Sequence, residues 1–359
     1  MNVLLDNIVF HLQKVGGISV YWKELLMRLF NESDINLYCI NKSSIENCIY
    51  QELNQNIDLS KIRNLFPVIN YRYFPIILQN QNYICHSSYY RPFLISGAKK
   101  VVTVHDFMYE RFDSGLKKYV HSLQKKLAIA NADTVVCISQ STKQDLLRYY
   151  PEFSSKNIKI IYNGVGATFR RLDKLSLKQQ VMELGFSGQF LLVVGNRVGC
   201  KNFVVTAEAF QFLSQSFHLV IVGHPLSENE KRILGKSIDK VHVFTGINEE
   251  MLNYLYNQAF ALLFPSLYEG FGIPIVEAMK AGCPVITTKY SSIPEIALNA
   301  GVYMQSNSAK AIIDCVTLLG NSDFRKEIEL QGLLNSERFS WDNTYEQLLE
   351  IYRELYEKM

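Results

Sequence analysis

Residues 259–288 read AFALLFPSLYEGFGIPIVEAMKAGCPVITT and contain a complete structural unit. The apolar run 260–264 predicts a short buried strand, and residues 284–288 predict a second one. Between them, Pro274 suits the first turn of a helix, where its missing N–H needs no partner, and Gly282 suits the end of that helix. The stretch therefore predicts a strand, a glycine-containing loop, a short helix and another strand.

The loop before this helix is suited to an anionic ligand. Gly270 and Gly272 let the backbone approach a ligand closely. The N-terminus of the helix presents free N–H groups and a partial positive charge, which favour phosphate. Glu269 lies in the loop, where a reacting sugar would sit, and Glu277 is placed in the first turn of the helix, within reach of a ribose diol. These residues predict a site for a sugar phosphate or a nucleotide.

The string from Pro265 to Glu277 resembles the donor-binding signature of retaining glycosyltransferase family 4, with seven residues between Glu269 and Glu277. The resemblance implies that Glu269 is catalytic, that Glu277 binds the nucleotide ribose and that the anomeric configuration is retained. It also implies that the loop residues bind the donor diphosphate; these are Gly270, Phe271 and Gly272.

Apolar runs alternate with amphipathic stretches in two consecutive series. The first series of predicted strands covers residues 3–5 with 8–10, then 35–40, 101–104, 134–138 and 158–161. The second covers 190–194, 219–222 and 241–244 before the 259–288 unit. Helices are predicted at 20–30, 114–131, 142–149, 203–213 and 249–256. Two such series predict an α/β protein with two doubly wound parallel sheets.

The family resemblance implies the GT-B fold, in which two Rossmann-like domains face each other across a cleft. We expect an N-terminal acceptor domain at residues 1–166 and a C-terminal nucleotide-sugar donor domain at 167–340. A C-terminal helix at 341–359 would cross back to the first domain, with Trp341 in its core. Residues 42–95 have no interpretable pattern.

Two cations follow the predicted strand 190–194. Arg197 stands in Gly-Asn-Arg and Lys201 in Lys-Asn-Phe, and both resemble the family's diphosphate clamp. Arg offers a bidentate fork and Lys a point charge, which together would stabilise a leaving nucleoside diphosphate. The sequence has no Asp-x-Asp pair of the kind that holds a divalent ion. We therefore expect no metal and no other cofactor.

The first half of the chain adds four candidate residues. Gly16 and Gly17 follow the first strand and resemble the family's N-terminal glycine loop, which closes over the donor phosphate. His105, in Thr-Val-His-Asp, resembles the histidine near the transferred sugar and is the second candidate catalytic residue. A structural core histidine is the alternative. Asp106 is a candidate to orient it.

Composition excludes several classes of protein. A hydrophobic content of 48% and a charged content of 20% fit a globular protein with a large core. Residues 1–165 hold 19 Lys and Arg against 13 Asp and Glu, a bias too small for nucleic-acid binding. The seven cysteines are not closely paired, which argues against a disulfide framework or a zinc site. No signal peptide or spanning run is predicted, so a cytoplasmic location is expected.

Membrane contact is a further expectation from the first half. The basic bias favours a peripheral site on the cytoplasmic face of the inner membrane. The helix at 114–131 carries Lys117, Lys118, Lys125 and Lys126. The simplest interpretation is a solvated helix face, with lipid contact as the alternative.

The combined interpretation is a retaining, metal-independent hexosyltransferase. The Gly-Asn-Arg and Lys-Asn-Phe forms resemble bacterial O-antigen mannosyl- and rhamnosyltransferases, which favours GDP-mannose as donor and a lipid-linked oligosaccharide as acceptor. Two alternatives remain open: a nucleotide-sugar 2-epimerase on the same fold, and a non-catalytic nucleotide-sugar-binding partner.

Overall fold

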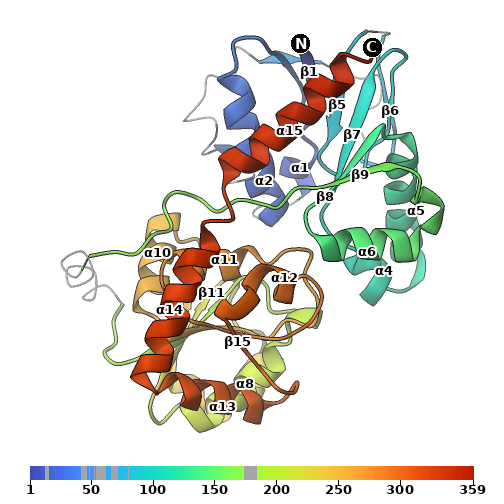
Figure 1. The fold of residues 1–359 in the computed structure, drawn as a ribbon. Coiled ribbons are helices and arrows are strands. Elements are labelled where there is room, and N and C mark those ends of the chain that lie inside the picture. Colours follow the sequence, from blue (N-terminus) through green and yellow to red (C-terminus); the bar gives the residue numbers. More distant parts are fainter. Residues whose placement is uncertain are drawn as a thin grey trace. The chain divides into compact units, whose positions relative to one another are not determined.

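The computed structural model describes residues 1–12, 16–41, 47, 49–51, 53, 62–65, 72–79, 81–173 and 184–359. The chain forms two compact units. Unit 1 comprises Met1–Gly164 together with Trp341–Met359, and unit 2 comprises Val165–Ser340 (Figure 1). Most of the segment without an interpretable pattern before residue 72, and much of the linker after residue 173, lie outside the described residues.

Unit 1 is built on a parallel sheet with strand order β3-β2-β1-β5-β7-β8-β9. A separate two-stranded sheet pairs β4 with β6. The strands are β1 (Asn2–Asp6), β2 (Asn36–Ile40), β3 (Arg63–Asn64), β4 (Ile76–Ile77), β5 (Ile84–Ser87), β6 (Phe93–Leu94), β7 (Lys99–Val104), β8 (Thr134–Cys137) and β9 (Asn157–Ile160). The helices are α1 (Val9–Leu12), α2 (Gly17–Phe30), α4 (Met108–Phe112), α5 (Gly115–Asn131), α6 (Gln140–Tyr149), the 3-10 helix η2 (Pro151–Phe153) and α15 (Trp341–Tyr356).

Unit 2 is built on a second parallel sheet, with strand order β12-β11-β10-β13-β14-β15. The strands are β10 (Phe190–Val194), β11 (His218–Val222), β12 (Val241–Phe244), β13 (Ala261–Phe264), β14 (Val285–Thr287) and β15 (Gly301–Tyr303). The helices are α8 (Phe203–Leu213), α9 (Glu228–Leu234), α10 (Glu249–Gln258), α11 (Ile273–Lys280), α12 (Ile293–Ala297), α13 (Ala309–Leu319) and α14 (Ser322–Ser336), with 3-10 helices η4 (Gly199–Lys201), η5 (Gly235–Lys240) and η6 (Leu298–Ala300).

Both sheets are doubly wound and parallel, which confirms the predicted fold class. In unit 2, α8 packs with α9 and α13, whereas α11 packs with α10 and α14, so helices cover both faces of the sheet. The strands are correspondingly buried on both sides; Leu191, Leu219 and Leu262 have no exposed surface. Such strands read as continuous apolar runs, and this explains why the sequence pattern located them.

One strand prediction in unit 1 is wrong. Residues 8–10 were expected to continue the first strand, but β1 ends at Asp6 and Val9 begins the short helix α1. The carboxylate of Asp6 accepts a hydrogen bond from the Ile8 N–H, which turns the chain there, and Val9 N donates to the Ser88 hydroxyl. Asp6 also pairs with the buried Arg91 at 3.1 Å. These polar contacts end the strand at Asp6, although residues 8–10 are apolar.

The returning helix α15 completes the core of unit 1. Trp341, Leu348 and Tyr352 are buried in the same cluster as Trp22 and Leu26 of α2, and the Trp341 ring meets the Tyr21 ring edge-on. The Tyr352 hydroxyl lies 2.5 Å from Nδ1 of the buried His86. The sequence expectation that Trp341 belongs to a core is confirmed by these contacts.

Candidate active site

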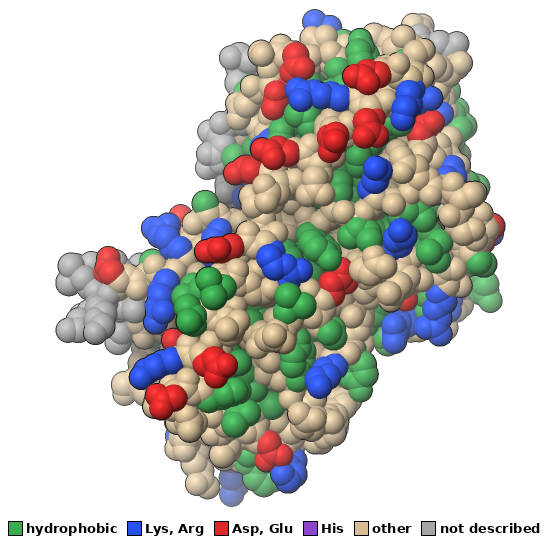
Figure 2. Space-filling view, viewed as in Figure 1, with side chains coloured by type: hydrophobic (Ala, Val, Ile, Leu, Met, Phe, Trp, Pro, Cys, Tyr) green, Lys and Arg blue, Asp and Glu red, His purple; other side chains and the backbone are tan. Residues whose placement is uncertain are grey.

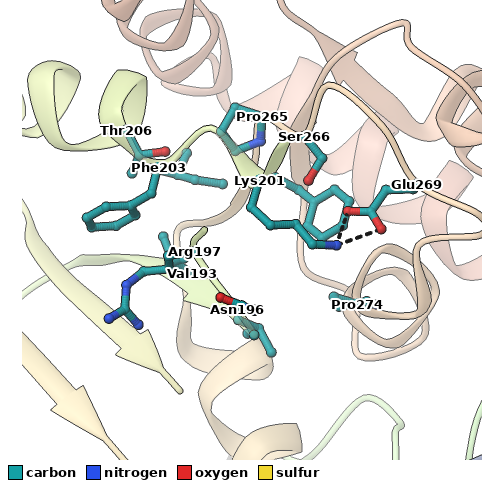
Figure 3. A pocket seen from close by; sticks show the side chains of 14 residues that line it. Val193, Asn196, Arg197, Lys201, Phe203, Thr206, Pro265, Ser266, Glu269 and Pro274 are labelled. Atoms are coloured by element: carbon teal, nitrogen blue, oxygen red, sulfur yellow. Dashed lines mark hydrogen bonds and ion pairs between the residues drawn. The ribbon is translucent and has the colours of Figure 1, made fainter. Parts of the chain in front are cut away.

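The strand order of unit 2 reverses between β10 and β13. From β10 the chain runs through β11 to β12 at one edge, and from β13 it runs through β14 to β15 at the other. In doubly wound sheets, ligands bind beyond the carboxyl ends of the strands at this switch point. A hollow that is open to solvent lies there, lined by residues from the ends of β10 and β13 and from the start of α11 (Figure 3).

Lys201 and Glu269 meet in this hollow. The Lys201 amine lies 2.7 and 2.8 Å from the two carboxylate oxygens of Glu269, and both side chains are partly buried (Figure 3). Lys201 ends η4 after strand β10, whereas Glu269 follows strand β13, so the fold joins residues 68 positions apart. The fold therefore brings a cation and a carboxylate together in this hollow.

Hydrogen bonds fix the positions of the two loops that carry Lys201 and Glu269. The N–H of Leu267 donates to the carbonyl of Cys200 at 2.7 Å, and the Asn202 amide donates to the carbonyl of Pro265. On the other side, the Ser291 hydroxyl accepts from the N–H of Glu269, and the Ser292 hydroxyl donates to the carbonyls of Glu269 and Phe271. The position of the Glu269 carboxylate is thus fixed by the 199–202 turn and by the loop after β14.

Arg197 points away from the Lys201–Glu269 pair (Figure 3). Its guanidinium donates to Glu230 at 2.7 Å and to the carbonyls of His224 and Pro225, and the residue is only 9% exposed. Its Nη1 is buried without a hydrogen-bond partner among the described residues. The structure therefore places only one of the two predicted clamp cations, Lys201, beside Glu269. Arg197 is tied to the start of α9.

Glu230 was not identified from the sequence as a site residue. It is the fourth member of a capping box at the start of α9, in which its carboxylate accepts from the N–H of Ser227 and the Ser227 hydroxyl accepts from the N–H of Glu230. The same carboxylate binds Arg197. The Ser-x-x-Glu spacing at 227–230 is a recognisable helix-start signal and could have located this carboxylate, although not its partner.

The glycine loop leads into α11 as the sequence indicated. Gly272 has a φ of 102°, and a Cβ there would lie 3.0 Å from Ile275, so glycine is required at this N-cap position. Pro274, in the first turn, lines the hollow. Phe271 is buried with its ring edge-on to Phe339, so its side chain is part of the core of unit 2. If Phe271 and Gly270 bind the donor, they do so through their main-chain atoms.

Glu277 lies in the second turn of α11, not in the first turn as predicted. It is not among the residues that line the hollow around Lys201. The Tyr256 hydroxyl donates to its carboxylate at 2.9 Å. Burial raises the pKa of Glu277 to about 7, the hydrogen bond from Tyr256 opposes this, and the nearby Glu249 adds to it. A carboxyl group in this position changes its charge near neutral pH.

The Glu277→Gln variant tests this pKa. Because the pKa of Glu277 in the folded protein lies above its ordinary value of 4.5, its contribution to stability is complete below pH 4.5 and is lost as the pH rises through 7. Glutamine cannot ionise and can still accept from Tyr256. At pH 8 the variant should be more stable than the wild type by about 1–3 kcal/mol, with no difference at pH 4.5. Urea unfolding at both pH values measures this, and equal stabilities at pH 8 would contradict the assignment.

The candidates in the first half of the chain lie in unit 1. His105 follows β7, is almost fully buried and meets the Tyr21 ring edge-on at 5.2 Å. Its Nε2 is buried, and no hydrogen-bond partner for it occurs in the described part of the chain. Burial lowers the pKa of His105 to about 4, so the imidazole is neutral at pH 7. Asp106 does not orient it through a hydrogen bond with that nitrogen; the Asp106 carboxylate accepts from the N–H of Met108.

Gly16 and Gly17 lie at the start of α2. Gly16 is the N-cap residue, with an extended backbone, and Gly17 is the first helical residue. The carbonyl of Gly16 accepts from the N–H of Val20. The first turn of α2 begins without a side-chain cap. Residues 13–15 lie outside the described part of the chain.

Family models match both halves of the chain. A model described as "Glycosyltransferase Family 4" matches residues 15–168, and one described as "Glycosyl transferases group 1" matches residues 183–332. The chain belongs to the family 4 glycosyltransferases. The paired loops of Lys201 and Glu269 therefore lie in the group 1 half of this glycosyltransferase.

Relatives of this glycosyltransferase include O-antigen enzymes. It is 26% identical to O-antigen chain mannosyltransferase B of Escherichia coli over 290 residues, which are 76% of this chain and 74% of the relative. It is also 26% identical to O-antigen chain mannosyltransferase RfbU of Salmonella typhimurium over 266 residues, 70% of each chain.

Solved structures give the fold. A sucrose-phosphate synthase from Thermosynechococcus elongatus superposes with a TM-score of 0.74 at 17% identity and full coverage of both chains. Anabaena HepE, solved in complex with UDP and glucose, gives 0.73 at 15% identity, covering 98% of this chain and 99% of that one. The fold of the glycosyltransferase is therefore GT-B. None of the helices in the described ranges is both long and apolar enough to cross a bilayer.

Proposed function

We propose that this glycosyltransferase moves mannose from GDP-mannose to a lipid-linked oligosaccharide, with retention of configuration and without a metal ion. The observation that carries the proposal is the Lys201–Glu269 pair at the switch point of unit 2. An amine and a carboxylate in one hollow match the two halves of a sugar diphosphate, one anionic and one rich in hydroxyls. The matched O-antigen mannosyltransferases support mannose as the sugar and a surface-polysaccharide precursor as the acceptor.

In the proposed reaction, Lys201 and Glu269 exchange each other for parts of the donor. The donor diphosphate takes the Lys201 amine from Glu269, and the hydroxyls of the sugar take its place on the carboxylate. Lys201 then stabilises the charge that develops on the departing GDP, which a preorganised cation does without reorganisation. Arg197 adds its unpartnered Nη1 to the same phosphates if it leaves Glu230. Glu277 holds the ribose, and neutral His105 donates or accepts at the transferred sugar.

In place of a metal ion, the proposal assigns the neutralisation of the diphosphate to cationic side chains and to helix N-termini. The reaction would take place at the cytoplasmic face of the inner membrane, where a lipid-linked acceptor is presented.

Thermal unfolding with a panel of nucleotides tests the donor. At a ligand concentration of 100 Kd, binding should stabilise the folded protein by about 2.7 kcal/mol and raise its Tm by several degrees. We expect this shift with GDP and GDP-mannose, in the presence of EDTA, and not with UDP or dTDP compounds. A shift with UDP-sugars alone would contradict the donor, and a shift that EDTA abolishes and magnesium restores would contradict metal independence. Donor isomerisation without acceptor would favour the 2-epimerase alternative.

A further inference from the structure

Helix α5 of unit 1 buries polar side chains and exposes apolar ones. Its inner side carries His121, Gln124 and Lys125, all buried. Its outer side, together with the end of α4, exposes six large apolar side chains, here called the α5 surface: Phe112, Leu116, Tyr119, Val120, Leu123 and Leu127. Five of the six lie at positions 116, 119, 120, 123 and 127 of α5, which fall on one side of a helix, so they form one stripe.

The inner contacts fix which side of α5 faces outward. The Lys125 amine pairs with Glu110 at 2.8 Å and donates to the carbonyl of Asp106. Gln124 donates to the carbonyl of Arg72, and the His121 ring stacks on Tyr109 at 3.7 Å between centroids. The solvated interpretation of the four lysines is therefore wrong for Lys125, whereas Lys117 and Lys126 are exposed. Because these polar groups find their partners inside unit 1, the apolar stripe cannot turn inward without breaking them.

Exposed apolar residues of unit 1 gather around this helix. Of the twelve large hydrophobic side chains that are exposed in the described part of unit 1, six form the α5 surface and four lie on a neighbouring segment: Tyr73, Phe74, Ile77 and Leu94. This segment is tied to α5 by the bond from Gln124 to Arg72 and by one from the N–H of Phe93 to the Asn131 side chain. Exposed apolar side chains gathered along one helix in this way mark an interaction site.

Basic side chains accompany the apolar stripe. Between residues 111 and 127, Arg111, Lys117 and Lys126 are exposed and Lys118 is half-buried, against the single carboxylate of Asp113. Lys117 lies 3.8 Å from Asp113, and Lys126 pairs with Glu152. At the edge of unit 1 where Figure 1 draws α5, Figure 2 shows hydrophobic and Lys or Arg side chains beside each other. The surface as a whole is apolar with a positive margin.

We propose that the α5 surface docks on a bilayer that contains anionic lipid, with α5 lying in the plane of the headgroups. A helix with an apolar stripe and flanking lysines is the form that interfacial helices take, since the apolar residues enter the acyl boundary and the cations meet lipid phosphates. A second copy of the chain fits less well, because a two-fold contact through this face would bring the same lysines together. The inference builds on the proposed function by naming the surface that would bring the enzyme to a lipid-linked acceptor.

Sedimentation with lipid vesicles tests the docking surface without any enzymatic readout. Purified full-length protein is mixed with vesicles of phosphatidylcholine containing 30 mol% phosphatidylglycerol, or with vesicles of phosphatidylcholine alone, as roughly chosen test compositions. The wild type should bind the anionic vesicles at least about tenfold more tightly than the neutral ones, and high salt should weaken the binding.

Three double variants locate the contact. Leu116→Gln with Leu123→Gln alters side chains that are 79% and 57% exposed, so the fold should be unaffected, and vesicle affinity should fall at least about tenfold. Leu330→Gln with Leu334→Gln changes an equally apolar pair on α14 of unit 2, 55% and 53% exposed, and should bind vesicles as the wild type does. Lys117→Gln with Lys118→Gln should reduce the preference for anionic vesicles.

Three outcomes would overturn the proposal: no vesicle binding by the wild type, equal binding by the α5 variant, or a stable wild-type dimer that the α5 variant dissociates. The last is read from the mass in solution by light scattering. The nucleotide panel keeps the two proposals separable. If the protein binds vesicles but no nucleotide, the proposed function is wrong and the docking surface stands. If it binds nucleotide but no vesicles, the docking surface is wrong and the proposed function stands.

Discussion

Replacing Lys201 with alanine is expected to lower the rate of sugar transfer by about 10²–10³-fold, the usual cost of removing one preorganised charge that stabilises a transition state. The Lys201 amine is the cation placed beside Glu269 in the hollow of unit 2, and the Arg197 guanidinium points elsewhere. Loss of the amine removes the charge proposed to stabilise the leaving diphosphate. Initial rates with donor and acceptor, at saturating donor, measure the effect on kcat.

Controls separate this effect from misfolding. The Glu269 carboxylate borders a solvent-accessible hollow, so loss of its partner should cost little stability, and the Tm of Lys201→Ala should stay near that of the wild type. Lys231→Ala, at an exposed lysine paired with Glu228, should leave the rate unchanged. Glu269→Ala should lose activity to a similar extent. Near-wild-type turnover in either site variant, with the fold intact, would remove the pair from the proposed mechanism.

The buried lysine of α5 gives the largest expected effect on stability. Lys125→Met keeps most of the side-chain volume but removes the charge that faces Glu110, and both groups are almost fully inaccessible. Breaking a buried pair in this way leaves an uncompensated carboxylate and costs about 3–5 kcal/mol. The lysine also lies 4.3 Å from the centre of the Phe107 ring, so a cation–π contact is lost as well. Urea unfolding of the purified variant measures the change.

Two further variants show whether the buried charge is the cause. Lys126→Met changes the neighbouring lysine, whose pair with Glu152 is exposed, and should cost far less stability than Lys125→Met. Lys125→Met combined with Glu110→Gln removes both charges, and it should recover much of the stability lost in the single variant. If Lys125→Met were no more destabilising than Lys126→Met, the buried pair would not matter to the fold.

Most of the fold could be predicted from the sequence because parallel strands buried on both faces are unbroken apolar runs. The predicted bounds at 190–194, 203–213 and 241–244 coincide with β10, α8 and β12. The failures occurred where polar contacts overrule a local pattern. At residues 8–10 these contacts are the hydrogen bonds from Ile8 to Asp6 and from Val9 to Ser88, and at Lys125 the contact is the ion pair with Glu110.

The candidate site could be predicted as a set of residues, but not as a set of contacts. The loop, the helix start and the strand ends could be placed from glycine, proline and apolar spacing. Which carboxylate each cation meets depends on tertiary structure, and sequence spacing gave no sign that Lys201 would pair with Glu269 or Arg197 with Glu230. The roles assigned to these residues remain predictions that the variants above test.

The return of α15 to unit 1 has a consequence for biosynthesis. Unit 2 is one continuous segment, so it can acquire its whole core as soon as Val165–Ser340 has left the ribosome. The core of unit 1 includes Trp341, Leu348 and Tyr352, which are translated after every residue of unit 2. Domains usually complete folding in the order of synthesis, with the N-terminal one first. Here the N-terminal sheet must wait, with part of its apolar surface uncovered, until the nascent chain has passed through the second unit.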